Sequence, residues 1–185
     1  MDQRGLVERA REGDHDAFTI LVDLTVARLD AAARLILRDP ELARDAVQEA
    51  LITAWRRMPG LRDPDRFDAW LYRLLVNASL DLARRRRRRV YEVELQPTDE
   101  PAVPDTAGAF ADRALLDEAL ADLQPGHRAV VVLHYYLGMP LPDVAQAVGI
   151  PLGTAKSRLH YALAAMRTTV AADLATTPLA EGQPA

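Results

Sequence analysis

Apolar residues recur every three or four positions along most of the chain, and polar residues fill the places between them. This spacing is typical of amphipathic α-helices. In the first part of the chain it predicts a short helix over residues 3–12, a longer one that opens at His15, and a third over residues 40–58. The residues expected on the core side of the long helix are Phe18, Leu21, Val22, Val26, Leu29, Ala33, Ile36 and Leu37.

Short breaks separate these predicted helices. Gly13 and Asp14 end the first one, and Asp14 is a suitable N-cap for the second. Asp39 and Pro40 mark the next boundary, because proline is favoured at the first position of a helix. Two prolines and a glycine then predict that residues 59–66 form a loop without helix.

The stretch from Phe67 to Arg89 predicts a central helix with two unlike faces. Its apolar stripe consists of Trp70, Leu71, Leu74, Leu75, Ala78 and Leu82. Its polar face consists of Arg73, Asn77, Asp81, Arg84 and Arg88. Six consecutive arginines, residues 84–89, cover every side of a helix, so they cannot all pack on a core without unpaired buried charge. We interpret the helix as a DNA-binding element. The alternative is that the arginines bind no ligand, because the helix dipole by itself stabilises cationic side chains near a helix C-terminus.

Helical periodicity disappears between about residues 92 and 111, where three prolines alternate with acidic residues. Residues 94–123 carry one arginine and eight acids, whereas the flanking parts are slightly basic. Such composition is typical of a flexible acidic linker. We therefore predict an all-α protein with two small domains, at residues 1–93 and 112–172, joined by a linker at 94–111 and followed by a disordered tail at 173–185.

The second predicted domain has the spacing of a helix-turn-helix. Helices are expected over residues 112–123, 125–137, 142–148 and 153–172. The positions that set the motif are Val144, Ala145, Val148, Gly149, Ile150 and Ala155, with Gly149 where the turn needs a positive φ. Side chains of the last helix that could enter a major groove are Thr154, Lys156, Ser157, Arg158, His160 and Tyr161. The pattern alone is equally compatible with a helical hairpin that has no role in DNA binding.

Composition narrows the class of protein. Only 5% of residues are aromatic, which favours aliphatic helical cores, and there is no cysteine for a disulfide or a thiolate metal site. No apolar run approaches the roughly 20 residues of a membrane span, so we expect a cytoplasmic protein without membrane insertion. The four histidines are scattered and match no catalytic or metal-binding spacing. We expect that the protein is not an enzyme and that it has no cofactor and no small-molecule substrate.

The chain contains three motifs in the order ELARDAVQEALITAWRRM, FDAWLYRLLVNASLDLARRRRRR and VGIPLGTAKSRLHYALAAMR. Together they resemble the bacterial sigma-70 family, and the resemblance is strongest to its extracytoplasmic-function branch. The resemblance covers roughly Phe18–Arg89 and Leu115–Arg167. It implies a factor without catalytic activity that binds core RNA polymerase, directs it to promoter DNA and helps to melt the duplex. Many relatives are held by an anti-sigma factor, and the sequence leaves open whether this chain has such a partner.

The resemblance also implies roles for individual residues. Asp45, Gln48 and Glu49 would dock on the clamp helices of the polymerase. The loop Leu61–Phe67 and the helix after it would read the −10 element, with Asn77 as the main candidate for a base contact. The full set of −10 residues is Arg62, Arg66, Phe67, Arg73, Asn77, Arg84, Arg85 and Arg88. The −35 element would be read by Thr154, Lys156, Ser157, Arg158, His160 and Tyr161.

Two other classes of function stay in competition. A free-standing helix-turn-helix regulator would need a ligand pocket and usually a dimer seam, and the sequence offers no candidate residues for either. A sigma-like module kept only to bind a partner is less compatible with an intact arginine run and with Lys156 and Arg158. The promoter initiation factor is therefore the favoured interpretation, with the free-standing regulator as the alternative.

Overall fold

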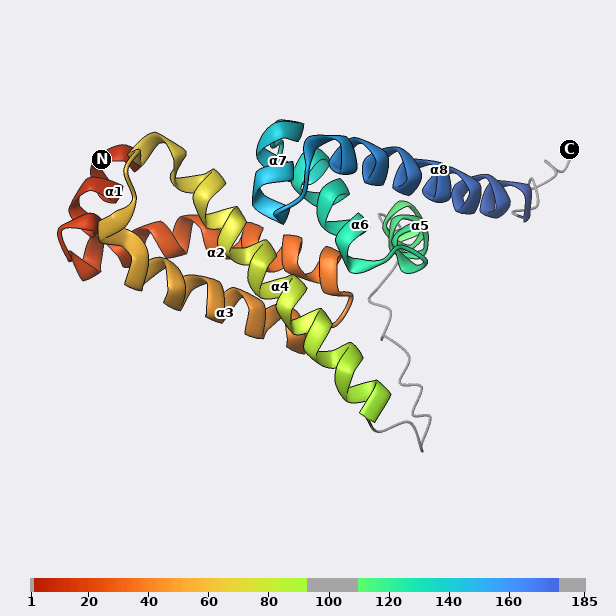
Figure 1. Cartoon of the computed structure of the whole chain (residues 1–185), viewed down its shortest axis with the longest axis horizontal. Helices are drawn as coiled ribbons and strands as arrows, with labels where there is room; N and C mark the ends of the chain where they lie inside the picture. Colours follow the sequence, from red (N-terminus) through yellow and green to blue (C-terminus); the bar gives the residue numbers. More distant parts are fainter. Residues whose placement is uncertain (1, 93–109, 177–185) are drawn as a thin grey trace, which may run out of the picture.

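The computed structural model describes residues 2–92 and 110–176, and every regular element in these ranges is helical (Figure 1). The N-terminal half, residues 2–92, contains α1 (Gln3–Arg11), α2 (His15–Leu37), α3 (Pro40–Arg57), η1 (Met58–Gly60), η2 (Pro64–Arg66) and α4 (Phe67–Glu92). The C-terminal half, residues 110–176, contains α5 (Phe110–Ala121), α6 (Pro125–Val131), η3 (Val132–Tyr136), α7 (Leu141–Val148) and α8 (Leu152–Thr176). The predicted all-α class is confirmed.

Two details of the predicted elements change. The predicted loop holds two short 3₁₀ turns, η1 and η2, because a proline in the first two positions of each turn fixes a helical φ. Helix α8 continues to Thr176, past residue 172 where we placed the end of the second domain. Most of the predicted linker and most of the predicted tail lie outside the described residues.

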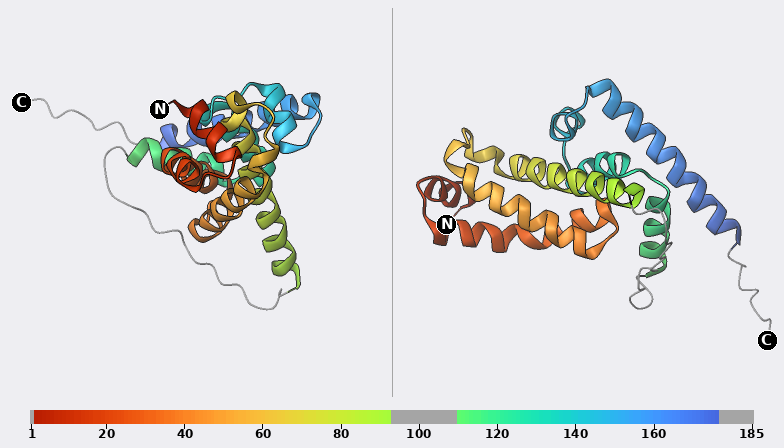
Figure 2. Two further views of the ribbon diagram at one scale, coloured as in Figure 1. Left: turned by 90° about the vertical axis from the view of Figure 1, so that its left-hand side faces the viewer. Right: turned by 60° about the horizontal axis from the view of Figure 1, so that its bottom comes forward.

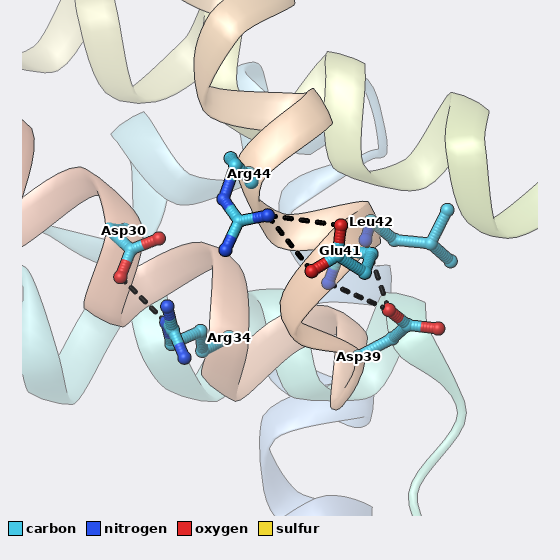
Figure 3. Close-up of polar contacts among 6 residues, drawn as sticks. All are labelled: Asp30, Arg34, Asp39, Glu41, Leu42 and Arg44. Carbon is cyan, nitrogen blue, oxygen red and sulfur yellow. Dashed lines mark hydrogen bonds and ion pairs between the residues drawn. The ribbon is translucent and has the colours of Figure 1, made fainter.

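Aspartate caps define where the helices of the N-terminal half begin. Asp14 accepts a hydrogen bond from the backbone N–H of Ala17 at 3.0 Å and so caps α2. Asp39 accepts from the N–H groups of both Glu41 and Leu42 at 3.0 Å and caps α3, with Pro40 at its first position (Figure 3). Both predicted boundaries are confirmed. They could be predicted because capping depends on local sequence alone.

Helices α2, α3 and α4 pack around the core of the N-terminal half. The predicted apolar stripe of the central helix faces this core, with Leu71 and Leu75 at most 1% exposed. Ser79 is also fully buried, and its hydroxyl donates to the carbonyl of Leu75 at 2.8 Å. Val26 was expected in the core but is 37% exposed, because it lies at the edge of the apolar face of α2.

The C-terminal half contains the predicted helix-turn-helix. Helix α7 ends at Gly149, whose φ of +73° is the left-handed conformation that the turn requires. Val144 and Ala155, on the two sides of the turn, are fully buried. Helix α6 runs into the π-helical turn η3, in which the His134 ring Nδ1 lies 2.8 Å from the carbonyl oxygen of Met139. Leu133 and Leu137 are buried.

The two halves lie against each other (Figures 1 and 2). One hydrophobic cluster contains Leu61 and Leu74 from the N-terminal half and Leu133, Met139 and Ala147 from the C-terminal half. Helix α7 packs beside α4, α6 lies on α2, and α8 extends away from the N-terminal half. Apolar side chains of both halves are buried in this cluster. Their burial stabilises the packed arrangement by roughly 25 cal/mol for each Å² of apolar surface removed from water.

Arg128 of α6 is the one buried charged side chain among the described residues, at 7% exposed. Its Nε donates to the carbonyl of Ile36 at 2.7 Å, and its Nη1 donates to those of Leu120 and Ala121 at 3.3 and 3.5 Å. These carbonyls belong to the last turns of α2 and α5, where the helix leaves acceptors unsatisfied and carries partial negative charge. Burial, and to a smaller extent Arg38, lowers the pKa of Arg128 to about 10, so the guanidinium stays charged at neutral pH.

Replacing Arg128 by methionine is expected to lower the free energy of unfolding by about 2–5 kcal/mol, because two buried carbonyls and one partly buried carbonyl lose their donor. Urea denaturation followed by circular dichroism measures this loss. The matched control is Arg167→Met on the exposed surface of α8, which should change the free energy of unfolding by less than about 0.5 kcal/mol. Equal stability of the two variants would contradict the anchoring role.

Candidate nucleic-acid and polymerase interfaces

One face of α3 carries the three residues expected to dock on the polymerase. Asp45, Gln48 and Glu49 lie three or four positions apart and are all exposed. The opposite side of the helix is buried through Ala46 and Ala50. Within the part of the chain that the structure describes, these three side chains have no hydrogen bond or ion pair. The acidic face is therefore available to a partner.

The loop expected to read the −10 element is held in place by α1. Arg4 Nη1 lies 2.7 Å from Asp65 Oδ2, and Gln3 Nε2 donates to Asp68 Oδ1 at 2.8 Å. Asp65 draws the pKa of Arg4 upward, which is the sign expected for a paired guanidinium. Within the loop, Asp63 accepts from the N–H of Asp65 at 3.1 Å and caps η2. Sequence reasoning missed this role of α1, because nothing local links its first turn to residues about 60 positions away.

The expected −10 residues before and at the start of α4 include both exposed and buried side chains. Arg62, Arg66 and Arg73 are exposed. Phe67 is only 1% exposed and its ring lies 6.0 Å from that of Trp70, so in this conformation it cannot contact DNA and instead anchors the first turn of α4 in the core. Trp70 is half-buried, as expected for a residue of the apolar stripe.

Farther along α4, the polar face is exposed as the spacing predicted. Asn77 is exposed and, among the described residues, its side chain has no hydrogen-bond partner. In the arginine run, Arg84 pairs with Asp81 on the same helix and Arg86 pairs with the α3 cap Asp39.

The other members of the run differ from these two. Arg85, Arg87 and Arg88 are exposed and have no ion pair with any described residue. Arg86 thus has a structural partner, whereas Arg85 and Arg88 are free to bind phosphate. The spacing alone could not separate these cases, because the distinction depends on where the N-cap of α3 lies. The side chain of Arg89 lies outside the described residues.

A shallow cleft of about 200 Å³ lies between α7 and the −10 loop. From the N-terminal half it is lined by Arg62, Arg66 and Arg73, together with Trp70. From α7 it is lined by Asp143, Gln146 and Ala147. Arg66 Nη2 lies 3.0 Å from Asp143 Oδ1, so one of the expected −10 arginines already has an acidic partner.

The expected −35 residues sit at the beginning of α8. Lys156, Ser157, His160 and Tyr161 are exposed, and Thr154 is half-buried. The Ser157 hydroxyl donates to the carbonyl of Gly153 at 3.0 Å, an interaction within the helix that a ligand can replace. These side chains form the exposed beginning of a recognition helix.

Arg158 differs from its neighbours because it lies against α6. Its Nη1 is only 3.1 Å from where a Cβ on Gly126 would be, so a larger residue at 126 would displace the guanidinium. Burial, and next the charge of Arg158, lowers the pKa of His127, so this imidazole is neutral at neutral pH. The His127 ring centroid lies 5.8 Å from that of Tyr161. Arg158 thus links the recognition helix to α6 while its side chain remains partly accessible.

The described residues contain no group of three or more histidine or carboxylate side chains that could hold a metal ion. None of the helices in residues 2–92 and 110–176 is both long and apolar enough to cross a membrane. The surfaces offer an acidic face on α3, a basic face on α4 and a helix-turn-helix, a combination suited to binding a protein and a polyanion.

Two protein families match the chain, one in each half. Residues 21–89 match sigma-70 region 2, and residues 113–166 match sigma-70 region 4. The first match contains the α3 face and the −10 residues, and the second contains the helix-turn-helix. Helix α1 lies outside both matches.

Relatives with known names match over most of their length. The extracytoplasmic-function (ECF) sigma factor SigL of Mycobacterium tuberculosis is 39% identical over 153 residues, which cover 81% of this chain and 86% of SigL. The RNA polymerase sigma-E factor of Streptomyces coelicolor is 36% identical over 141 residues, covering 76% of this chain and 78% of that protein.

Solved structures have the same fold. CnrH in complex with the cytosolic domain of CnrY matches with a TM-score of 0.66 and 30% identity, over 92% of this chain and 98% of that one. The sigma factor RpoE of Bartonella quintana in complex with the anti-sigma factor NepR matches with a TM-score of 0.71 and 25% identity, over 84% and 98% of the two chains. Both similarities extend across the two halves.

Proposed function

The chain belongs to the sigma-70 family, in its extracytoplasmic-function group, and on that premise we propose how its surfaces divide promoter recognition among them. The protein is an RNA polymerase sigma factor that directs the polymerase to promoters, and its partners are core RNA polymerase and promoter DNA. Sigma factors are initiation factors rather than catalysts. We place its action in the cytoplasm, where the polymerase works on the chromosome.

The acidic face of α3 is the proposed contact with the clamp helices of core polymerase. Asp45, Gln48 and Glu49 project from a helix whose other side is fixed in the core, so the face is rigid before binding. A helix already fixed in the core loses little backbone freedom on association. Its negative charge would also steer a basic partner surface toward it.

The −10 element is assigned to the loop before α4 and to the polar face of that helix. Extruding a base from the duplex costs a few kcal/mol, which contacts to the base and the backbone must return. Asn77 offers both a donor and an acceptor to a base, and it has no partner among the described residues to give up. Arg62, Arg73, Arg85 and Arg88 would hold phosphates of the separated strand.

The −35 element is assigned to the start of α8. Lys156 and Arg158 can bond guanine edges or phosphates, and Thr154 and Ser157 can bond either. Since residues 110–176 carry five Lys and Arg against six Asp and Glu, the affinity of this half for DNA alone should be low. Attachment to the polymerase through the other half compensates by raising the effective concentration of this domain at the promoter.

An anti-sigma factor is a further proposed partner. Bartonella quintana RpoE, which has the same fold, is bound by the anti-sigma factor NepR in its structure. The same kind of partner would keep this chain from the polymerase until a signal releases it.

The observation that carries the proposal is the presence of regions 2 and 4 in one chain, with a free acidic face on α3 and a free basic face on α4. Run-off transcription with purified core polymerase on DNA from the source genome tests it. Transcripts that start at specific sites only when the protein is present are expected. Duplex binding by the protein alone, without core binding, would instead favour a free-standing regulator, and core binding without initiation would indicate a partner-binding module.

A further inference from the structure

The loop before α4 turns one side into the core and the other toward solvent. Leu61, Pro64 and Phe67 lie three positions apart and are all buried. A 3₁₀ turn brings every third residue onto the same side, so this period follows from η2. The residues between them are exposed: Arg62, Asp63, Asp65 and Arg66. The outer side of the loop therefore carries both signs of charge at neighbouring positions.

Helix α1 separates the two signs. Arg4 Nη1 lies 2.7 Å from Asp65 Oδ2, so this carboxylate is directed toward α1, which lies beside the loop (Figure 1). Arg62 and Arg66 instead line the cleft together with Arg73, whereas Asp65 lies outside that lining. Because Asp65 and Arg66 are adjacent in the chain, holding the first also limits where the second can turn.

A second contact joins α1 to the first turn of α4. Gln3 Nε2 donates to Asp68 Oδ1 at 2.8 Å. Gln3 and Arg4 are the first two residues of α1, whose N-cap Asp2 accepts from the N–H of Gly5 at 3.0 Å. The two donors thus leave the same capped turn of α1 and reach the loop and the helix that follows it.

The rest of α1 is fixed in the core of the N-terminal half. Leu6, Val7 and Ala10 are at most 3% exposed. At the other end of the helix, Arg9 Nη2 lies 2.6 Å from Oδ2 of Asp14, the N-cap of α2. A rigid support of this kind can hold a loop in place before a ligand arrives, which lowers the ordering cost of binding.

We propose that the first turn of α1 is a positioning element for −10 recognition: Arg4 holds Asp65 away from the DNA and thereby keeps the arginines of the loop turned toward it. Gln3 supports the same arrangement through Asp68. This inference rests on the assignment of the loop to the −10 element. Neither donor touches DNA, and α1 lies outside the segment that matches region 2.

Replacing either partner of the ion pair distinguishes positioning from overall charge. Arg4→Gln deletes a positive charge and Asp65→Asn deletes a negative one, so an effect of charge alone would shift the affinity for DNA in opposite directions. Loss of positioning would instead lower −10 selectivity in both variants. Selectivity is the ratio of two affinities of the polymerase holoenzyme, for the promoter fragment mapped by run-off transcription and for the same fragment with one −10 base pair changed. The two fragments carry equal charge, so non-specific attraction cancels.

We expect this ratio to fall about two- to fivefold in Arg4→Gln, in Asp65→Asn and in the double variant alike, because the second change removes no further contact. The size suits a pair whose side chains are 55% and 63% exposed. Arg4→Lys keeps the charge and should retain most of the selectivity. The matched controls are Arg34→Gln and Asp30→Asn, which break a partly exposed ion pair on α2 and should leave the ratio unchanged. Opposite shifts in the two single variants, or an equal fall in the controls, would overturn the proposal.

Amide hydrogen exchange of Arg66, followed by nuclear magnetic resonance on the full chain, tests the same contact without polymerase or promoter. The N–H of Arg66 donates to the carbonyl of Asp63 at 3.2 Å within the loop. Its exchange should be about two- to fivefold faster in Arg4→Gln and Asp65→Asn, and unchanged in Arg34→Gln. The same spectra verify that each variant is folded.

The two measurements separate the possible failures. Unchanged exchange of Arg66 would show that α1 does not hold the loop. Faster exchange with unchanged selectivity would show that α1 holds the loop but has no role in reading the −10 element. If no specific start depended on the protein, the proposed function would fail, and the role in −10 recognition with it. The exchange rates would still report whether α1 holds the loop.

Discussion

Reversing the charge of the α3 face is expected to abolish the association with core polymerase. The double variant Asp45→Arg/Glu49→Arg should weaken binding at least about a hundredfold, because like charges brought together across an interface cost several kcal/mol. Both side chains are exposed and have no partner among the described residues, so the fold should be unaffected. Competition binding with labelled core polymerase measures the change, and circular dichroism verifies the fold.

The control for this variant carries the same change in charge elsewhere. Asp23→Arg on α2 and Glu118→Arg on α5 replace exposed acids outside the proposed face. If core binding fell equally in both double variants, the loss would reflect the net charge of the protein, and the α3 face would have no special role. A selective loss in the first variant, with unchanged affinity for a fluorescein-labelled single strand of 20 thymidines (dT20), would assign α3 to the polymerase and not to DNA.

Removing the free arginines of α4 is expected to weaken DNA binding and to reduce its dependence on salt. Arg85→Gln/Arg88→Gln should lower the affinity for dT20 about ten- to a hundredfold at low salt. It should make the slope of log K against log salt shallower by roughly 1.4, or 0.7 for each lost contact with single-stranded DNA. Anisotropy titrations over a range of salt concentrations measure both quantities.

Two arginines of other surfaces supply the control for that experiment. Arg34 and Arg44 are paired with Asp30 and Glu41, and their replacement by glutamine removes the same total charge (Figure 3). We expect little change in the slope. An equal change in the two double variants would mean that the protein attracts DNA only by its overall charge. Arg86→Gln tests whether the arginines of the run differ from one another. Because Arg86 is paired with Asp39, the loss of the Arg86 charge should affect the slope least.

Both tested surfaces are accessible in the packed arrangement of the two halves. Neither Arg85 and Arg88 nor the α3 face lines the cleft beside α7, and all of these side chains are exposed.

Local sequence was sufficient to predict the helices and most of their buried faces. Asp14, Asp39 and Gly149 act on backbone groups within a few residues, so the boundaries they set can be predicted from the sequence. The apolar stripe of α4 was also predicted correctly, since a helix of fixed period puts these residues on one side wherever it packs. The acidic face of α3 and the exposed Asn77 follow from the same geometry.

What only the tertiary structure decided was which side chains meet across long separations. Arg66 and Asp143 are 77 positions apart, and Arg128 lies 92 positions from Ile36. No periodicity connects such pairs, because their distance depends on how whole helices pack. Phe67 had the same apolar character as a stacking residue, and only its burial placed it in the core. Sequence thus determined each surface of this sigma factor, whereas packing decided that α7 lies over one of them.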